Sequence, residues 1–295
     1  MPSGLIDCHL HLVYPDRARP AWMAGVSTYQ DKGFTFPDFE IVEGREAIAA
    51  SVFMEVDVRG ERIEAESEKI AELIADRAVP VVGQIAACRP EHEAGFDAWL
   101  SRADELGIVG YRRILHVGVP EDLSRHGVFR DNVRKVGEAG KVFDICMLAR
   151  QLPLAVELIA ACPGTFFVLD HCGNPDVAAG EIEEWRAGIK AVAGLPNVAA
   201  KMSGILANCA PGKAGETEVR PYLEELIEVF GAGRIVWGSD WPVVNSRADL
   251  QSWTQITAKI LGALGATERA AIEWVNAVRI YKLAEKLKAK GIERG

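Results

Sequence analysis

The chain has 295 residues, a length that suits one large domain such as an eight-stranded α/β barrel. Hydrophobic residues make up 49% and charged residues 25% of it, which indicates a globular protein with a substantial core. The formal net charge of -9 argues against nucleic acid or an anionic membrane as partner, because both bind basic surfaces.

The beginning of the chain, MPSGLIDCHLHL, lacks a basic segment followed by an apolar one, so we expect no secretory signal. No run of 18 apolar residues predicts a membrane span. The six cysteines are scattered without a CxxC pair, which indicates reduced, buried thiols. We therefore expect a cytoplasmic protein that acts on a small molecule, and both a monomer and a homo-oligomer stay open.

Eight short apolar runs predict strands, and amphipathic segments between them predict helices. The predicted strands are 5–11, 49–58, 81–88, 108–115, 142–148, 165–171, 197–203 and 235–240. The predicted helices are 61–77, 91–106, 121–139, 152–161, 182–192 and 218–230. This alternation predicts a distorted (β/α)₈ TIM barrel as a single domain over residues 1–295. The alternative is an open doubly wound sheet, which would carry a Gly-rich turn where this chain has His-Leu-His.

One connection departs from the pattern. Residues 12–43 show no helical periodicity but contain several prolines, glycines and aromatic residues. A loop of this length in a compact domain usually covers an active site, and the aromatic residues favour a lid over disorder. The tail 283–295 has the composition of a solvated helix end.

The first strand carries two histidines near its carboxyl end. Alternation along a strand places Asp7, His9 and His11 on one face, so both imidazoles can reach one ion or one substrate. In the second strand the same rule turns Glu55 and Asp57 inward, away from Met54, Val56 and Val58. A carboxylate inside a barrel needs a metal, a cation or hydrogen bonds, so a neighbouring Lys or Arg is the alternative to a metal role.

Three later strands also end in polar residues. His171 ends the apolar run before Gly173, where either a core histidine or a ligand fits. Lys201 shares an inward face with Ser203 and could bind an oxyanion or neutralise Glu55. Asp240 ends the last strand, and because barrel chemistry gathers at the carboxyl ends of strands, we expect it to be a general base.

Two neighbouring arginines, Arg112 and Arg113, end the fourth strand. Only one of them can point inward, and which one is open. A guanidinium there would suit a substrate carboxylate or carbonyl. Aromatic residues at the strand ends and in the loop, Tyr14, Trp22 and Trp241, are candidates for the pocket wall. The sequence contains no GxSxG elbow and no P-loop, which argues against a serine hydrolase or a nucleotide-binding enzyme.

Taken together, IDCHLH, FDICMLARQLP, VLDHCGNP, AAKMSG and WGSDWPV resemble the amidohydrolase superfamily (amidohydrolase family 2), in the branch of 2-pyrone-4,6-dicarboxylate lactonase and sugar-lactone hydrolases. The resemblance covers the chain from Leu5 to about Tyr281. It implies a distorted barrel that hydrolyses a lactone ester, with Asp240 as the base that activates water. It also implies that His9, His11 and His171 hold a divalent metal or the substrate carbonyl, with Arg112 and Lys201 beside the substrate.

The chain departs from the wider superfamily in its fourth and fifth strands. Where that superfamily has a carboxylated Lys or a Glu and then a His, this chain has the two arginines and then Asp144 and Cys146. A binuclear site is therefore not expected, and one zinc ion or metal-free catalysis are both open. Candidate ligands of a mononuclear site are His9, His11, Glu55, His171 and Asp240.

Two other functions compete with lactone hydrolysis. Non-oxidative decarboxylation of an aromatic or unsaturated acid uses a similar His-x-His and a similar final Asp in the same superfamily. A barrel that binds small molecules without catalysis would carry fewer polar residues at its strand ends.

Overall fold

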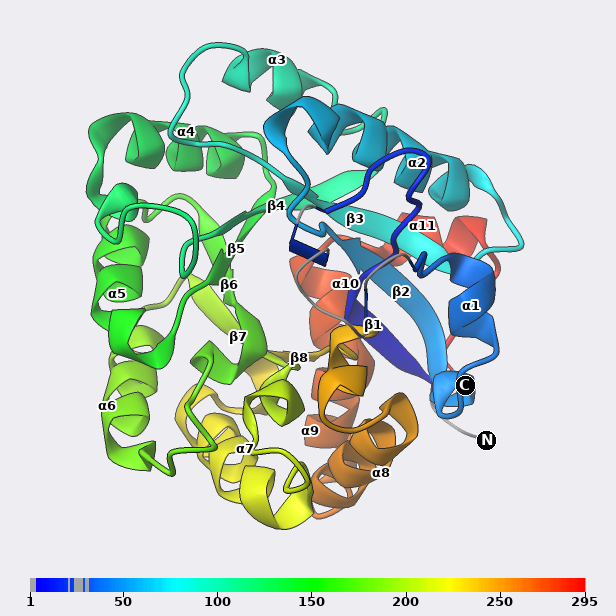
Figure 1. Cartoon of the computed structure of the whole chain (residues 1–295), viewed down its shortest axis with the longest axis vertical. Helices are drawn as coiled ribbons and strands as arrows, with labels where there is room; N and C mark the ends of the chain where they lie inside the picture. Colours follow the sequence, from blue (N-terminus) through cyan, green and yellow to red (C-terminus); the bar gives the residue numbers. More distant parts are fainter. Residues whose placement is uncertain (1–3, 21, 24–28, 30–31, 295) are drawn as a thin grey trace.

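The apolar segments predicted as strands all form parallel strands, and each pairs with the next along the chain. The computed structural model describes residues 4–20, 22, 23, 29 and 32–294. The strands lie in the middle of the molecule with helices around them (Figure 1). They are β1 Leu5–Leu10, β2 Ile48–Met54, β3 Val81–Ala87, β4 Ile108–Ile114, β5 Val142–Cys146, β6 Phe166–Leu169, β7 Val198–Met202 and β8 Ile235–Trp237.

The helices alternate with the strands, as the amphipathic segments predict. The six predicted helices all form, although α2, α3 and α4 are shorter than predicted, α3 most strongly. Four more follow β8. The bounds are α2 Ile63–Ala75, α3 Phe96–Ser101, α4 Gly127–Glu138, α5 Leu152–Ala161, α6 Ile182–Ala193, α7 Glu216–Phe230, α8 Leu250–Leu261, α9 Ala266–Ala270, α10 Asn276–Ile280 and α11 Ala284–Ala289. The (β/α)₈ barrel predicted from the alternation is therefore confirmed.

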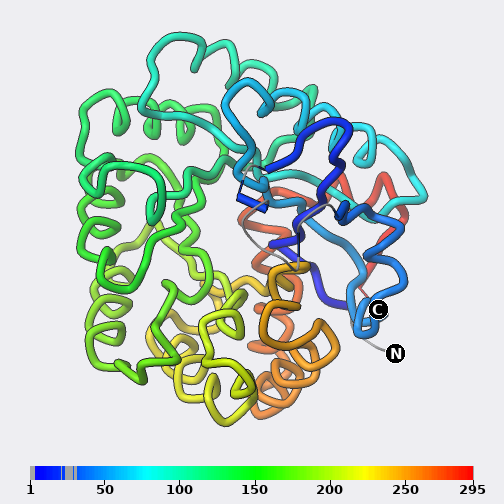
Figure 2. Tube along the Cα trace, viewed as in Figure 1, coloured from blue at the N-terminus to red at the C-terminus, as the bar shows by residue number. Residues whose placement is uncertain are grey.

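The barrel closes just beyond the end of β8. The chain passes once around the ring from the blue β1 to the yellow β8, which brings the first and last strands together (Figure 2). The backbone N–H of Asp240 donates to the His9 carbonyl at 2.9 Å, and the N–H of His11 donates to the Trp241 carbonyl at 2.9 Å. Asp7 strengthens this seam because its carboxylate accepts hydrogen bonds from the backbone N–H and the hydroxyl of Ser239.

Two apolar cores pack against the two faces of the sheet. The outer core fills the space between strands and helices. The inner core contains residues from all eight strands, such as Val52 and Val236, and is covered at one end by Trp274, Tyr281 and Leu283 from the end of the chain.

Several expectations about local structure were wrong. Residues 36–40, inside the predicted loop 12–43, form the short helix α1 Phe36–Glu40, with Asp38 accepting from the backbone N–H of Thr35. Met54 packs in the inner core and Phe53 in the outer one, the reverse of the predicted faces of β2. The simple alternation fails beyond this strand because β2 ends at Met54 and Asp57 has a φ of 53°.

Strict alternation also fails in β1. The pairing of β1 with β2 shifts register between Asp7 and Leu10, so Asp7 contacts the Ser239 segment while His9 points to the strand-end residues described below.

The tail is not merely a solvated helix end, because Leu283 is fully buried against the inner core. We predict that Leu283→Ala lowers the free energy of unfolding by about 2–5 kcal/mol, since it leaves a cavity at the end of the barrel. The control, Glu285→Ala on the exposed side of α11, should unfold like the unmodified protein. Equal denaturant midpoints for the two variants would show that the tail does not complete the core.

Candidate active site

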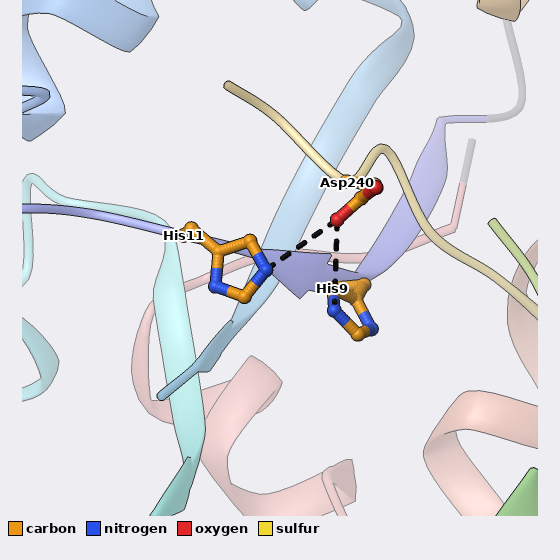
Figure 3. A group of neighbouring side chains, drawn as sticks. All are labelled: His9, His11 and Asp240. Carbon is orange, nitrogen blue, oxygen red and sulfur yellow. Dashed lines mark ion pairs between the residues drawn. The ribbon is translucent and has the colours of Figure 1, made fainter. Parts of the chain in front are cut away.

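Three side chains converge where the barrel closes. His9 lies in β1, His11 follows it, and Asp240 follows β8. The Nε2 atoms of His11 and His9 lie 3.4 and 3.7 Å from the same Asp240 oxygen, Oδ1 (Figure 3). Each residue is at most 8% exposed. The seam hydrogen bonds hold this arrangement, since they connect the backbones that carry these side chains.

The orientation of His11 leaves two acceptors facing each other. Its Nδ1 lies 3.0 Å from the Met54 carbonyl, which can only accept, so Nδ1 carries the proton. The Nε2 atom of a neutral His11 then carries a lone pair, which is directed at the Asp240 carboxylate. Such a pair is favourable only with a proton or a cation between the two atoms.

His171 stands next to this group. Its ring centroid is 4.4 Å from that of His9, and its Nδ1 lies 3.0 Å from the Ser203 hydroxyl. Gly204 makes room for it, because a Cβ at that position would lie 2.2 Å from His171 Nδ1. His171 and Asp240 have φ values of 53° and 56°, and such left-handed non-glycine residues cluster at functional sites.

Arg112 points into the barrel, which resolves the choice between the two arginines. Its guanidinium donates to Glu55 Oε1 at 2.6 Å and to the Glu55 carbonyl at 2.8 Å. It also lies 3.3 Å from Asp170 Oδ2 and 3.2 Å from His9 Nε2. Arg113 points the other way and donates to Glu91.

Lys201 is fully buried inside the barrel. Its Nζ contacts Asp144 Oδ2 and lies 2.9 Å from Asp170 Oδ1. The Tyr281 hydroxyl donates to the same Asp144 oxygen at 3.3 Å. The ammonium is therefore neutralised by Asp144 and Asp170. Of the two roles considered for Lys201, neutralising Glu55 was wrong, because Arg112 pairs with that carboxylate.

The buried charges shift one another's protonation. Burial, followed by the charge of Lys201, lowers the pKa of His9 well below its usual value. Burial alone would raise the pKa of Asp170, but Lys201, His9 and Arg112 outweigh it and hold that pKa well below its usual value. Burial raises the pKa of Asp144 to about 7, against the opposing effect of Lys201. Asp170 is thus the firmly ionised carboxylate of this network.

Residues 6–283 match the Amidohydro_2 family, described as amidohydrolase. The chain belongs to this family. A curated relative, an L-fucono-1,5-lactonase from Burkholderia ambifaria, is 31% identical over 145 residues. That match covers 48% of the amidohydrolase described here and 50% of the relative, about half the length of each.

Solved structures share the fold of this amidohydrolase. A zinc-bound amidohydrolase from Burkholderia multivorans superposes with a TM-score of 0.84 at 23% identity, over 95% of this chain and 99% of that one. A putative 2-pyrone-4,6-dicarboxylic acid hydrolase from Pseudomonas putida has a TM-score of 0.72 at 21% identity, over 96% and 99% of the two chains. Among the described residues of this amidohydrolase, no helix is both long and apolar enough to cross a membrane.

The predicted aromatic wall is only partly at the site. Tyr14 lies beside α1 and α2, where its hydroxyl accepts from the Phe36 N–H and Lys69 lies over its ring. Trp241 is 2% exposed and packs against Phe34 and Phe39. Trp22 is 40% exposed and donates to the Val56 carbonyl just beyond β2, so it is the most exposed of the three.

Three polar residues of this amidohydrolase lie at the site although the sequence analysis gave them no role there. Asp170 immediately precedes His171, Asp144 lies in β5, and the half-buried His116 follows β4. Burial, and then the charges of His171 and Arg112, lower the pKa of His116 to about 4. The signal for Asp170 was present, since it is a charged residue at the end of a buried strand, like Asp240.

A divalent metal fits one set of these residues. His9, His11 and Asp240 offer two nitrogens and one oxygen, whereas Glu55 is bound by Arg112 and lies in neither group of potential ligands among the described residues. Ligands about 2.0–2.1 Å from a tetrahedral zinc ion lie roughly 3.3–3.4 Å apart, close to the separation of His11 and Asp240. In this set Arg112 lies 3.2 Å from His9 Nε2. A second group, His9, Asp170 and His171, is less suitable because both Lys201 and Arg112 already contact Asp170.

We predict that Lys201→Met destabilises the amidohydrolase by about 3–5 kcal/mol, because it leaves buried Asp144 and Asp170 without their counter-ion. Asp144→Asn in the same chain should restore part of this loss. The exposed Lys190→Met serves as control, with denaturant unfolding as the measurement. A Lys201→Met protein as stable as the unmodified one would mean that this lysine is not a structural counter-ion.

Proposed function

We propose that this amidohydrolase hydrolyses a lactone ester, with Asp240 as the general base that activates water. The observation that carries the proposal is the convergence of His9 Nε2 and His11 Nε2 on one Asp240 oxygen at the carboxyl ends of the strands. A carboxylate oxygen in that position can take a proton from water beside an electrophile. The sequence similarity to an L-fucono-1,5-lactonase supports the lactone as substrate class.

In the proposed reaction, Asp240 takes one proton from water as the water oxygen bonds to the lactone carbonyl carbon. The resulting tetrahedral intermediate collapses with cleavage of the ring C–O bond. The proton then passes from Asp240 to the leaving alkoxide, either directly or through the neighbouring His171. The product is an open-chain hydroxy acid.

His9, His11 and Asp240 would hold one divalent metal, with zinc as the first candidate. A bound zinc ion supplies a Lewis acid for the carbonyl and lowers the pKa of water. The protein's own contribution is a dry, fixed setting, since His11 is oriented by the Met54 carbonyl and Asp240 by the seam. Lys201 is not placed to stabilise the oxyanion, because its ammonium is engaged by two carboxylates inside the barrel.

The ion pairs of Arg112 and Lys201 favour a neutral lactone over a dicarboxylate as the substrate. Arg112 and Lys201 point into the barrel, and both are already paired with buried carboxylates. A sugar lactone needs hydrogen bonds but no free cation. We therefore propose a sugar lactone as substrate, and we assign Arg112 to orienting the site instead of binding a substrate carboxylate.

We also propose that residues 12–43 close over the substrate. In support, Trp22 donates to the Val56 carbonyl beyond β2, and the Tyr29 hydroxyl donates to the Val243 carbonyl beyond β8. These two contacts connect the loop to strand ends on both sides of His9 and His11.

We predict that Asp240→Asn lowers kcat on a sugar lactone by about 10²–10⁴-fold, because the amide cannot take a proton from water. Ring opening is monitored through the acid that it releases into a weakly buffered solution. Asp131→Asn, an exposed change, serves as control and should keep full activity. Near-full turnover in Asp240→Asn would contradict its assignment as the base.

A broad substrate panel distinguishes the other functions. Release of CO₂ from aromatic acids without ring opening of any lactone would identify a decarboxylase. If no lactone or acid is converted, and substitutions at His9 or Asp240 leave the binding of small molecules unchanged, the protein is a non-catalytic barrel.

We predict about one zinc ion per chain after incubation with zinc and desalting, because the candidate site offers one set of three protein ligands. Elemental analysis measures the content. His11→Gln should reduce it strongly, while His126→Gln on the surface should not. Treatment with a chelator should remove the ion and the lactonase activity together. Full activity in metal-free protein would contradict a metal role and favour the histidines alone as the groups that polarise the carbonyl.

A further inference from the structure

We propose that Asp170 is a positioning residue that fixes the tautomer of His9, holding Nδ1–H toward its own carboxylate and turning the Nε2 lone pair toward Asp240. The use of this lone pair rests on the proposed function. The tautomer itself is a property of the protein and can be measured without any substrate.

The two ring nitrogens of His9 have opposite neighbours. Nδ1 lies 3.4 Å from Asp170 Oδ1, which as part of an ionised carboxylate can only accept. Nε2 lies 3.2 Å from a nitrogen of Arg112, which can only donate. Both neighbours therefore favour the proton on Nδ1 and a lone pair on Nε2.

Nδ1 is a buried atom without a hydrogen bond of standard geometry to any described residue. The Asp170 oxygen it faces is therefore the acceptor available to its proton. Hydrogen bonds at catalytic sites are often long in the ligand-free state and shorten in the complex. In proteins that bind metals, a carboxylate behind a histidine ligand performs this orienting role.

Asp170 is itself held in place from two sides. Lys201 Nζ lies 2.9 Å from the oxygen that faces His9, and Arg112 contacts the other oxygen at 3.3 Å. Both cations keep the carboxylate ionised and prevent it from rotating. Asp144 contacts Lys201 and Tyr281. Among the described residues, Asp144 makes no contact with His9.

Asp240 is the competing acceptor. Its Oδ1 lies 3.7 Å from His9 Nε2, beyond hydrogen-bond distance. If Asp170 were removed, Nδ1 would lose its acceptor and Arg112 would lose one of its carboxylate partners. We expect Asp240 then to draw the ring proton to Nε2, against the Arg112 nitrogen that faces this atom. The lone pair would then be lost from the site, and His9 could no longer serve as a ligand or acceptor there.

A charge-balanced pair of variants tests this inference. Asp170→Ala with Lys201→Met removes the acceptor of His9 together with one cation. Asp144→Ala with Lys201→Met also removes one carboxylate and the same cation, but leaves Asp170 in place. Each variant therefore removes one carboxyl group and the same lysine, and the two differ in whether the carboxylate that faces His9 is kept.

The tautomer is read from long-range ¹H–¹⁵N spectra of metal-free protein labelled in histidine, with His9 assigned from a His9→Gln variant. We expect Nδ1–H in the unmodified protein and in the Asp144 variant, and Nε2–H in the Asp170 variant. We further expect zinc affinity to fall about 10–100-fold in the Asp170 variant, measured by competition with a chromophoric chelator, and to be retained in its control.

An Nε2 proton on His9 in the unmodified protein would overturn the inference. This measurement tests the inference even if the Asp170 variant does not fold. Equal tautomers and zinc affinities in the two variants would also overturn it. If the tautomer and affinity results hold but no lactone is opened, the proposed function fails and the role of Asp170 stands.

Discussion

The seam between the last and first strands determines the geometry of the site. β8 is short, and the barrel closes through backbone hydrogen bonds that involve His9, His11, Asp240 and Trp241. Asp7 reinforces the seam by binding the Ser239 segment that precedes Asp240. The carboxylate and the two imidazoles therefore come together as a direct consequence of closing the barrel, without help from a flexible loop.

Beneath the seam, the barrel contains an unusual amount of buried charge. Glu55, Arg112, Asp170, Lys201 and Asp144 alternate in sign along a chain of contacts. Each charge would be costly to bury alone, so the chain persists because every member has an opposite neighbour. The same pairing places Asp170 beside one ring nitrogen of His9 and Arg112 beside the other.

Much of the fold was predictable from local pattern, because short apolar runs and amphipathic helices alternate through the chain. The approach of His9, His11 and Asp240 was also predictable, since the carboxyl ends of barrel strands share one face. The partners of Lys201 and Arg112 were not, because which buried carboxylate meets which cation depends on strand register. The faces of β1 and β2 were misassigned for the same reason, as a register shift and a left-handed residue interrupt the alternation.

The central claim is that the side chains gathered at the seam form a single metal-binding catalytic centre. The most direct test is a crystal structure of zinc-loaded protein, with anomalous diffraction recorded on both sides of the zinc absorption edge. The account predicts one zinc peak bonded to His9 Nε2, His11 Nε2 and Asp240. A peak coordinated by other residues, or a seam in which Asp240 has turned away from both imidazoles, would contradict it.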